Sequence, residues 1–175
     1  MQNRAPDLIN ERLEGWTPSG EAQQIIFWRI LQLMMARYGS VPLGQLLVGM
    51  TATVLNELGH APTVTELCEA TGLPKSSISR YISAQMEQGV IRESIDPRDR
   101  RRRMLEQTDD GKAERRWQIK HMRKILEDVH AWDSKRLETG QPLDPEKELA
   151  EMQRVAANAA EEFKQRRKRG RRAVA

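Results

Sequence analysis

Cysteine, aromatic residues and long apolar runs are scarce in this chain of 175 residues. The single cysteine, Cys68, excludes a disulfide within the chain and a metal site built from several cysteines, and it favours a reducing compartment. Apolar runs such as residues 25–28 are far too short to span a bilayer, and no basic-then-apolar leader opens the sequence. We therefore expect a cytoplasmic protein that neither crosses a membrane nor is secreted.

Sequence motifs for catalysis are missing as well. The sequence contains no Gly-x-Ser-x-Gly, no glycine-rich phosphate loop and no His-Glu-x-x-His. The histidines, His60, His121 and His130, are too scattered to form a metal site with neighbouring ligands. Cys68 falls inside a predicted helix, where a small packing residue is favoured over a redox sensor. We therefore expect no enzyme, no cofactor and no metal site.

Positive charge is concentrated in two places. The net charge of the chain is +4, yet residues 161–175 alone carry +5 because they contain seven basic and two acidic residues, so the remainder carries −1. Residues 98–103 form the second basic segment, with five arginines and one aspartate. Such local concentrations favour contact with a polyanion, although arginine runs also solubilise loops and tails.

Apolar periodicity predicts a chain that is mainly helical. A dense apolar segment at residues 21–37 has the length of a helix and is apolar on almost every side, which favours a subunit interface. Residues 1–19 are polar and predict a loose arm, which we expect Trp16 to anchor. Further helices are predicted at residues 43–58, 66–70 (capped by Thr63 or Thr65), 74–88, 109–138 and 145–165.

The predicted helix at residues 74–88 has two chemically different faces. Ile78, Ile82 and Met86 recur every four residues and are expected to face inward. The residues expected to face outward are Lys75, Ser76, Ser77, Ser79, Arg80 and Ser83. Such a helix fits the major groove of DNA, where short polar side chains and an arginine contact phosphates and base edges. Its first turn, after Pro74, favours phosphate.

A β-hairpin with an arginine-rich tip is predicted directly after this helix. Residues 90–95 and 103–107 are prone to form strands, and residues 96–99 have the chemistry of a turn. The tip of such a hairpin can reach a neighbouring minor groove, which attracts arginine where A·T base pairs narrow it.

Three motifs together resemble the MarR family of bacterial winged-helix regulators. They are Leu-Pro-Lys-Ser-Ser-Ile-Ser-Arg at residues 73–80, Asp-Pro-Arg-Asp-Arg-Arg at 96–101 and Thr-Asp-Asp-Gly at 108–111. The resemblance covers residues 21–165 in the order of elements, and at the level of motifs it is specific over residues 63–111. Gln107 departs from the family because an apolar residue is usual there, so we expect the second wing strand to pack loosely.

The resemblance implies roles for individual residues. Ser76, Ser77 and Arg80 would read the major groove, the wing arginines would enter the minor groove, and Asp99 would brace a neighbouring arginine. Including the flanking polar residues and the extended basic run, the predicted DNA contacts are Lys75, Ser76, Ser77, Ser79 and Arg80 on the helix and Arg98, Arg100, Arg101 and Arg102 on the wing.

The resemblance also implies a homodimer built by the first and last helices. The last helix repeats apolar and small residues at spacings of three and four, which favours a seam for a partner helix. The predicted interface consists of Ile26, Ile30, Met34, Leu149, Met152, Ala156, Ala159 and Phe163. Relatives bind small aromatic effectors beside these helices, and Trp28, Met35 and Trp117 are the candidate pocket residues, with core packing as the alternative.

We therefore predict a mainly α (α+β) winged helix-turn-helix protein with long dimerisation helices at both ends. The predicted divisions are a flexible arm at 1–19, a dimerisation helix at 20–42, a winged helix domain at 43–111, long C-terminal helices at 112–165 and a basic tail at 166–175. The predicted function is that of a repressor that binds a pseudo-palindromic DNA operator as a homodimer and is relieved by a small effector. Two alternatives stay open, namely an architectural protein that binds DNA without reading its sequence and an interaction module for another regulator.

Overall fold

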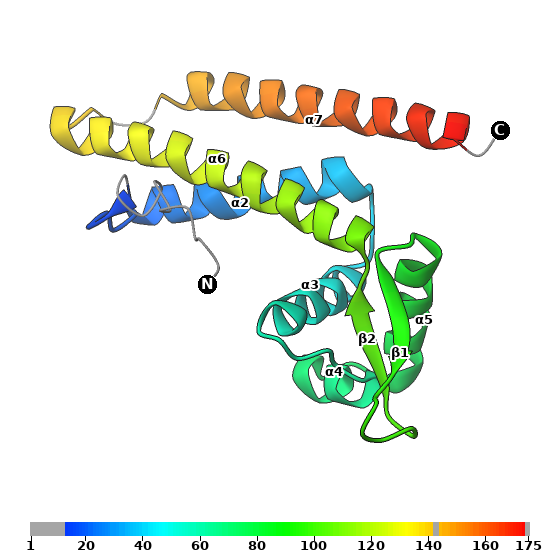
Figure 1. The fold of residues 1–175 in the computed structure, drawn as a ribbon. Helices are drawn as coiled ribbons and strands as arrows, with labels where there is room; N and C mark the ends of the chain where they lie inside the picture. The colour runs from blue at the N-terminus through cyan, green and yellow to red at the C-terminus, as the bar shows by residue number, and fades with distance from the viewer. Residues whose placement is uncertain (1–12, 142–143, 174–175) are drawn as a thin grey trace, which may run out of the picture. The chain divides into compact units, whose positions relative to one another are not determined.

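The computed structural model describes residues 13–141 and 144–173, with side chains up to residue 158 and at residue 161. The elements are α2 (Gly20–Tyr38), α3 (Leu43–Glu57), α4 (Val64–Thr71), α5 (Lys75–Glu87), β1 (Ile91–Ile95), β2 (Arg103–Gln107), α6 (Asp109–Thr139) and α7 (Pro145–Ala173) (Figure 1). The prediction of a mainly helical protein with a two-stranded wing is thereby confirmed.

The chain divides into two compact units. Of the described residues, those up to residue 40 and from residue 120 onward form the helical unit, and residues 41–119 form the winged unit. Among the described residues, no single helix is long and apolar enough to cross a membrane, and α2 and α3 meet that test only when taken together as a bent pair.

The winged unit has one core, to which α3, α4, α5 and both strands contribute. Its buried members are Val48, Ala52, Leu67, Ile78, Tyr81, Ile82, Ile91 and Leu105. The strands pair antiparallel, with Ile91 opposite Gln107 and Ile95 opposite Arg103. Leu105, the middle residue of β2, is the residue of that strand that is buried in the core. This core holds the two short helices and the wing together as one body.

The buried face of α3 differs from the one that its large apolar residues predict. Leu47, Val54 and Leu58 are 44%, 52% and 76% exposed, whereas Val48 and Ala52 are fully buried. The cause is the close approach of α5, since a Cβ atom added at Gly44 would lie 3.2 Å from the Tyr81 ring. Small residues therefore occupy the contact, and the larger ones lie beside it.

The start of α6 is fixed by the Thr-x-x-Gly motif. The Thr108 hydroxyl donates to the Gly89 carbonyl at 2.6 Å and accepts from the Gly111 amide at 3.0 Å. A Cβ atom at Gly111 would come within 2.2 Å of the Val90 carbonyl oxygen, so only glycine fits there. The motif thus fastens the helix to the chain segment between α5 and β1.

The helical unit contains α2, α7 and the later part of α6. Ala22, Ile25 and Val129 form its buried cluster, and α2 also packs against α7. Asp144 caps α7, because its carboxylate accepts from the amides of Glu146 and Lys147. α7 continues as a helix to Ala173, through the segment predicted as a basic tail.

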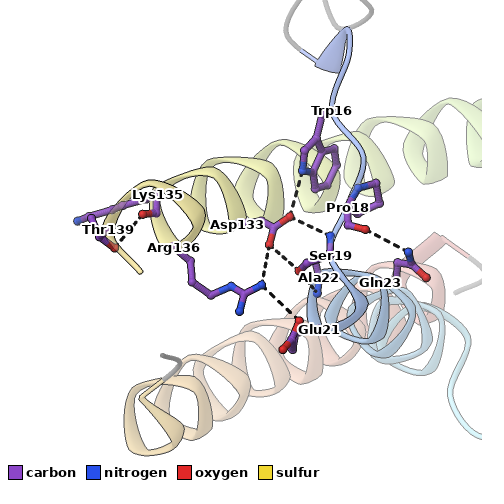
Figure 2. A network of polar contacts seen from close by, with 10 residues as sticks. All are labelled: Trp16, Pro18, Ser19, Glu21, Ala22, Gln23, Asp133, Lys135, Arg136 and Thr139. Atoms are coloured by element: carbon purple, nitrogen blue, oxygen red, sulfur yellow. Dashed lines mark hydrogen bonds and ion pairs between the residues drawn. The ribbon is translucent and has the colours of Figure 1, made fainter. Parts of the chain in front are cut away.

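A buried carboxylate ties the start of α2 to α6 (Figure 2). Asp133 is fully buried and accepts from the Trp16 indole N–H at 3.1 Å, the Ser19 amide at 3.1 Å and the Ser19 hydroxyl at 2.6 Å. Arg136 lies 3.5 Å from the same carboxylate and 3.3 Å from Glu21. Trp16 is therefore the anchor that the sequence predicts, and Ser19 serves both Asp133 and the amide of Ala22 as the cap of α2.

Candidate nucleic-acid interface

α4 and α5 form a helix-turn-helix whose turn is set by local sequence. Thr63 and Glu66 make a capping box: the Thr63 hydroxyl accepts from the Glu66 amide, and the Glu66 carboxylate accepts from the Thr63 amide at 2.7 Å. Gly72 ends α4 with φ of +69°, a left-handed conformation that suits glycine. The short connection that follows lets α5 begin at Lys75.

The sequence predicts Pro74 as the first helical residue of α5. In the structure Pro74 is instead the N-cap, and the helix begins at Lys75. Proline offers no side-chain acceptor, and no side chain in the described ranges caps this helix. The Ser77 amide donates to the Pro74 carbonyl at 2.9 Å, so the amides of Lys75 and Ser76 are the ones left for an external acceptor such as a phosphate, a role that the helix dipole favours.

The outer face of α5 carries most of the predicted contacts. Lys75, Ser76, Ser79 and Arg80 are exposed, whereas Ser77 is only half-exposed. The Arg80 guanidinium lies 5.2 Å from the centre of the Tyr81 ring, which holds it along the helix surface.

The inner face of α5 corrects one sequence prediction. Ile78 and Ile82 are buried as expected, but Met86 is 40% exposed, and Tyr81 and Gln85 take the remaining inner positions. Three- and four-residue spacings follow the helix more closely than a strict repeat of four, which drifts around its surface. The outer face consequently ends near Arg80 and Ser83.

The wing is a tight loop at residues 96–102, held by its own backbone and by two aspartates. The Asp96 amide donates to the Arg102 carbonyl at 3.0 Å, and the Arg102 amide donates to the Asp99 carbonyl at 2.9 Å. The side chains of Asp96 and Asp99 accept from the amides of Arg98 and Arg101. Asp99 thus braces the backbone of an arginine, in a turn that presents the tip side chains outward.

The arginines of the wing fall into two groups. Arg98, Arg100 and Arg101 are exposed at the tip, and none of them has an ion-pair partner within the part of the chain that the structure describes. Arg102 is different, because its guanidinium lies 2.9 Å from Glu66 and 3.8 Å from Asp96. Arg103 pairs with Glu93 across the strands at 3.0 Å. Three arginines therefore offer unpaired charge to a ligand.

The wing is attached to the helices by a series of polar contacts along β2. The side chain of Asn56, in α3, accepts a hydrogen bond from the Gln107 amide at 3.3 Å and donates one to the Leu105 carbonyl at 3.0 Å. The Leu105 amide in turn donates to the Pro62 carbonyl at 2.8 Å. The Gln107 side chain also donates to the Thr53 hydroxyl at 3.1 Å. The expectation that Gln107 loosens this strand is wrong, because hydrogen bonds replace the apolar contact.

Several residues that organise this surface were not singled out from the sequence. Glu66 contacts Arg102 at the end of the wing loop and Asn56 contacts Leu105 of β2, although these partners lie 36 and 49 residues away in sequence. The Thr63-x-x-Glu66 spacing was a readable sign of the capping box. No local sequence pattern predicts the additional contact between Glu66 and Arg102.

The predicted dimer and effector residues have mixed surroundings. In the helical unit, Met34 is buried, Ile26, Ile30, Met152 and Trp28 are half-buried, and Met35, Leu149 and Ala156 are exposed, while the side chains of Ala159 and Phe163 lie outside the described residues. Trp117 is half-buried in the winged unit. Phe27 and Leu31 join Met35 as an exposed stripe on α2, at 65%, 38% and 64%. The part of these residues in an interface or a pocket stays a prediction.

Comparison with known proteins gives a family match over this surface. A family model described as MarR family matches residues 48–102, from α3 through α4 and α5 to the wing. No curated protein sequence matches the chain.

Solved structures of similar chains include several regulators. A MarR-like transcriptional regulator from Thermotoga maritima is 16% identical, with 71% of this chain and 92% of that chain covered and a TM-score of 0.48. RV1404 from Mycobacterium tuberculosis is 17% identical, with 81% and 99% covered and a TM-score of 0.49. A probable transcriptional regulator from Pseudomonas aeruginosa is 20% identical, with 76% and 92% covered and a TM-score of 0.43.

Proposed function

We propose that this chain, a member of the MarR family of winged-helix transcriptional regulators, binds a pseudo-palindromic operator as a homodimer and represses transcription until a small aromatic effector releases it. Family membership makes it a DNA-binding regulator and not an enzyme. The homodimer, the operator, the repression, the effector and a cytoplasmic location go beyond family membership and are proposed here.

One observation carries the DNA-binding mode: the winged unit exposes a polar helix face and three unpaired arginines. Short serines on α5 let the backbone approach the major groove, and Arg80 can form two hydrogen bonds to a guanine. Lys75 and the open amides of the first turn suit a phosphate. The wing arginines Arg98, Arg100 and Arg101 suit a narrow minor groove.

The homodimer is supported by the exposed apolar stripe on α2. Phe27, Leu31 and Met35 are spaced four residues apart, so successive members are neighbours on the helix surface, and monomeric proteins seldom leave adjacent large apolar side chains in water. A second copy would bring an identical stripe and, by two-fold symmetry, a second α5. Two recognition helices about one turn of DNA apart require a pseudo-palindromic site.

The effector is the least constrained part of the proposal. Trp28 lies on the helix that bears the stripe and Met35 is part of the stripe, so a small aromatic molecule bound beside them would act on the helix that we assign to the dimer. Such a molecule would release DNA if it favoured a dimer geometry with the wrong spacing between recognition helices.

The experiment is a selection of bound sequences from a random DNA pool at physiological salt, with nonspecific competitor in excess. We expect enrichment of an inverted repeat with half-sites about ten base pairs apart. The Arg80→Ala variant should lose this enrichment while still binding DNA, and Ser83→Ala, on the same helix, is the matched control. Recovery of DNA without a motif would favour the architectural alternative, and a monomer that binds no DNA would favour the interaction module.

A further inference from the structure

We infer that Arg102 is a positioning residue, which fixes the wing tip to α4 through Glu66, and that it is not a DNA contact. Sequence alone places Arg102 in a continuous basic run with its neighbours. The structure separates it from them, because its guanidinium is held between two carboxylates while Arg98, Arg100 and Arg101 are exposed. The inference rests on the proposed DNA-binding function and refines the assignment of its contacts.

The geometry of Glu66 makes it a directed partner for Arg102. One carboxylate oxygen, Oε2, accepts from the Thr63 amide at 2.7 Å as part of the capping box, and the other, Oε1, accepts from Arg102 at 2.9 Å. His60 lies 3.2 Å from the same Oε1. Burial raises the pKa of Glu66, but hydrogen bonds with Thr63 and the charges of Arg102 and His60 outweigh it and hold that pKa below its usual value. Glu66 is therefore ionised when the protein is folded near neutral pH.

The Arg102–Glu66 pair is the outermost of the attachments along β2. The others join Gln107 to Asn56 and Thr53 at the base of the wing, and Leu105 to Asn56 and Pro62 in its middle. On the tip side of Leu105, Arg102 lies just before β2, and its pair with Glu66 joins the wing loop to α4, the first helix of the helix-turn-helix. Without it the tip would be held mainly by its own loop, and the three free arginines would lose a fixed position relative to α5.

Charge also argues against a direct contact between Arg102 and DNA. If the guanidinium moved to a phosphate, it would leave the carboxylates of Glu66 and Asp96 beside a negatively charged backbone. Exchanging one anionic partner for another gains little, whereas an anchored tip orders its free arginines before DNA arrives and lowers the entropy lost on binding. The favourable role for Arg102 is to hold the others in place.

The test compares Glu66→Gln, Arg102→Gln and Arg101→Gln by titration with a random-sequence duplex pool over a range of salt concentrations. Thr63 and Arg102 bond to different oxygens of the Glu66 carboxylate. In glutamine one of these two positions is an NH2 group, which cannot accept from Arg102 while the oxygen serves the capping box. We expect Glu66→Gln and Arg102→Gln each to weaken binding by about tenfold, the order of one hydrogen bond to a charged group, with an unchanged salt dependence. Arg101→Gln, the matched control, should also reduce the slope of log affinity against log salt by about 0.9 for each wing.

The sign of the Glu66 effect decides between the two roles. If Arg102 contacted phosphate and Glu66 merely neutralised it, Glu66→Gln would tighten binding and Arg102→Gln would reduce the salt slope, and either result would overturn the inference. Hydrogen exchange without DNA separates this failure from failure of the proposed function. We expect the Asp96 amide, which is bonded to the Arg102 carbonyl, to exchange faster in both variants than in wild type, and unchanged protection would refute the anchor even if no DNA bound.

Discussion

Asp133 in the helical unit and Glu66 in the winged unit each gather donors from distant parts of the chain. Asp133 is fully buried and accepts from Trp16 and Ser19, more than 110 residues away in sequence. The Glu66 side chain is 34% exposed and reaches across 36 residues to Arg102. The difference in burial determines how much each carboxylate contributes to stability. Removing a buried carboxylate leaves its donors without a hydrogen-bond acceptor, whereas water can take the place of a half-exposed one.

The two carboxylates therefore have different roles, one in stability and one in the placement of a loop. Asp133 holds the start of α2, and thus the helix that bears the exposed apolar stripe, against α6. Glu66 adds little to stability but sets the direction of a charged loop. Substitutions at the two positions should therefore separate stability from DNA affinity.

The largest expected effect is that of Asp133→Ala on stability. The substitution leaves the Trp16 indole, the Ser19 hydroxyl and the Arg136 guanidinium without their shared acceptor. We expect the free energy of unfolding to fall by about 3 kcal/mol, measured by urea denaturation at one fixed protein concentration. A loss below about 0.5 kcal/mol, as for an ordinary surface residue, would show that the network does not secure the unit.

Arg80→Ala is expected to have the next largest effect, on sequence discrimination. Loss of two hydrogen bonds to a guanine costs about 1–3 kcal/mol of preference for the correct base. The affinity for the selected duplex should therefore fall by at least about tenfold relative to a scrambled duplex. Equal losses on both duplexes would assign Arg80 to the phosphate backbone instead.

Acid should destabilise wild type more steeply than the Asp133→Asn variant. Burial raises the pKa of Asp133, but hydrogen bonds from Ser19 and Trp16 and the charge of Arg136 outweigh this effect, so the pKa of Asp133 lies below its usual value. A carboxyl with a lowered pKa in the folded state stabilises fully above its unfolded pKa, near 4 (about 3.9), and this stabilisation is lost as the pH falls through the folded value. Thermal melts below about pH 4 should show the two curves converging, and parallel curves would contradict this account.

The smallest expected effect is that of Glu21→Gln. Glu21 pairs with Arg136 in the same network but is 54% exposed, so water compensates for the lost ion pair. We expect a change in unfolding free energy within about 0.5 kcal/mol. A larger loss would mean that the exposed edge of the network matters as much as its buried centre.

The elements were predictable from the sequence because their ends are marked locally. Thr63 and Gly72 bound α4, and Asp144 caps α7, as capping preferences indicate. The buried face of α3 was not predictable in the same way, since it depends on how closely α5 approaches Gly44. Periodicity shows that a helix has an apolar side but not which neighbour will cover it.

In the candidate site, too, the features set by local sequence were predictable and those set by tertiary contacts were not. The exposed face of α5 follows from helical spacing alone, so its outward residues were largely foreseen. The status of Arg102 and Gln107 was not, because their partners, Glu66 and Thr53, are brought to them by the fold. The local sequence predicts that the wing is rich in arginine, but it does not predict which of these arginines form ion pairs within the fold.

The most direct measurement compares two conservative variants, Asp133→Asn and Glu66→Gln, by thermal melting and by DNA titration on the same samples. The account predicts that Asp133→Asn lowers the melting temperature with little change in the DNA affinity of the folded protein, whereas Glu66→Gln leaves the melting temperature nearly unchanged and weakens DNA binding. If Glu66→Gln instead lowered the melting temperature as much as Asp133→Asn and left DNA affinity intact, the claim that Glu66 positions a DNA-binding wing would be contradicted.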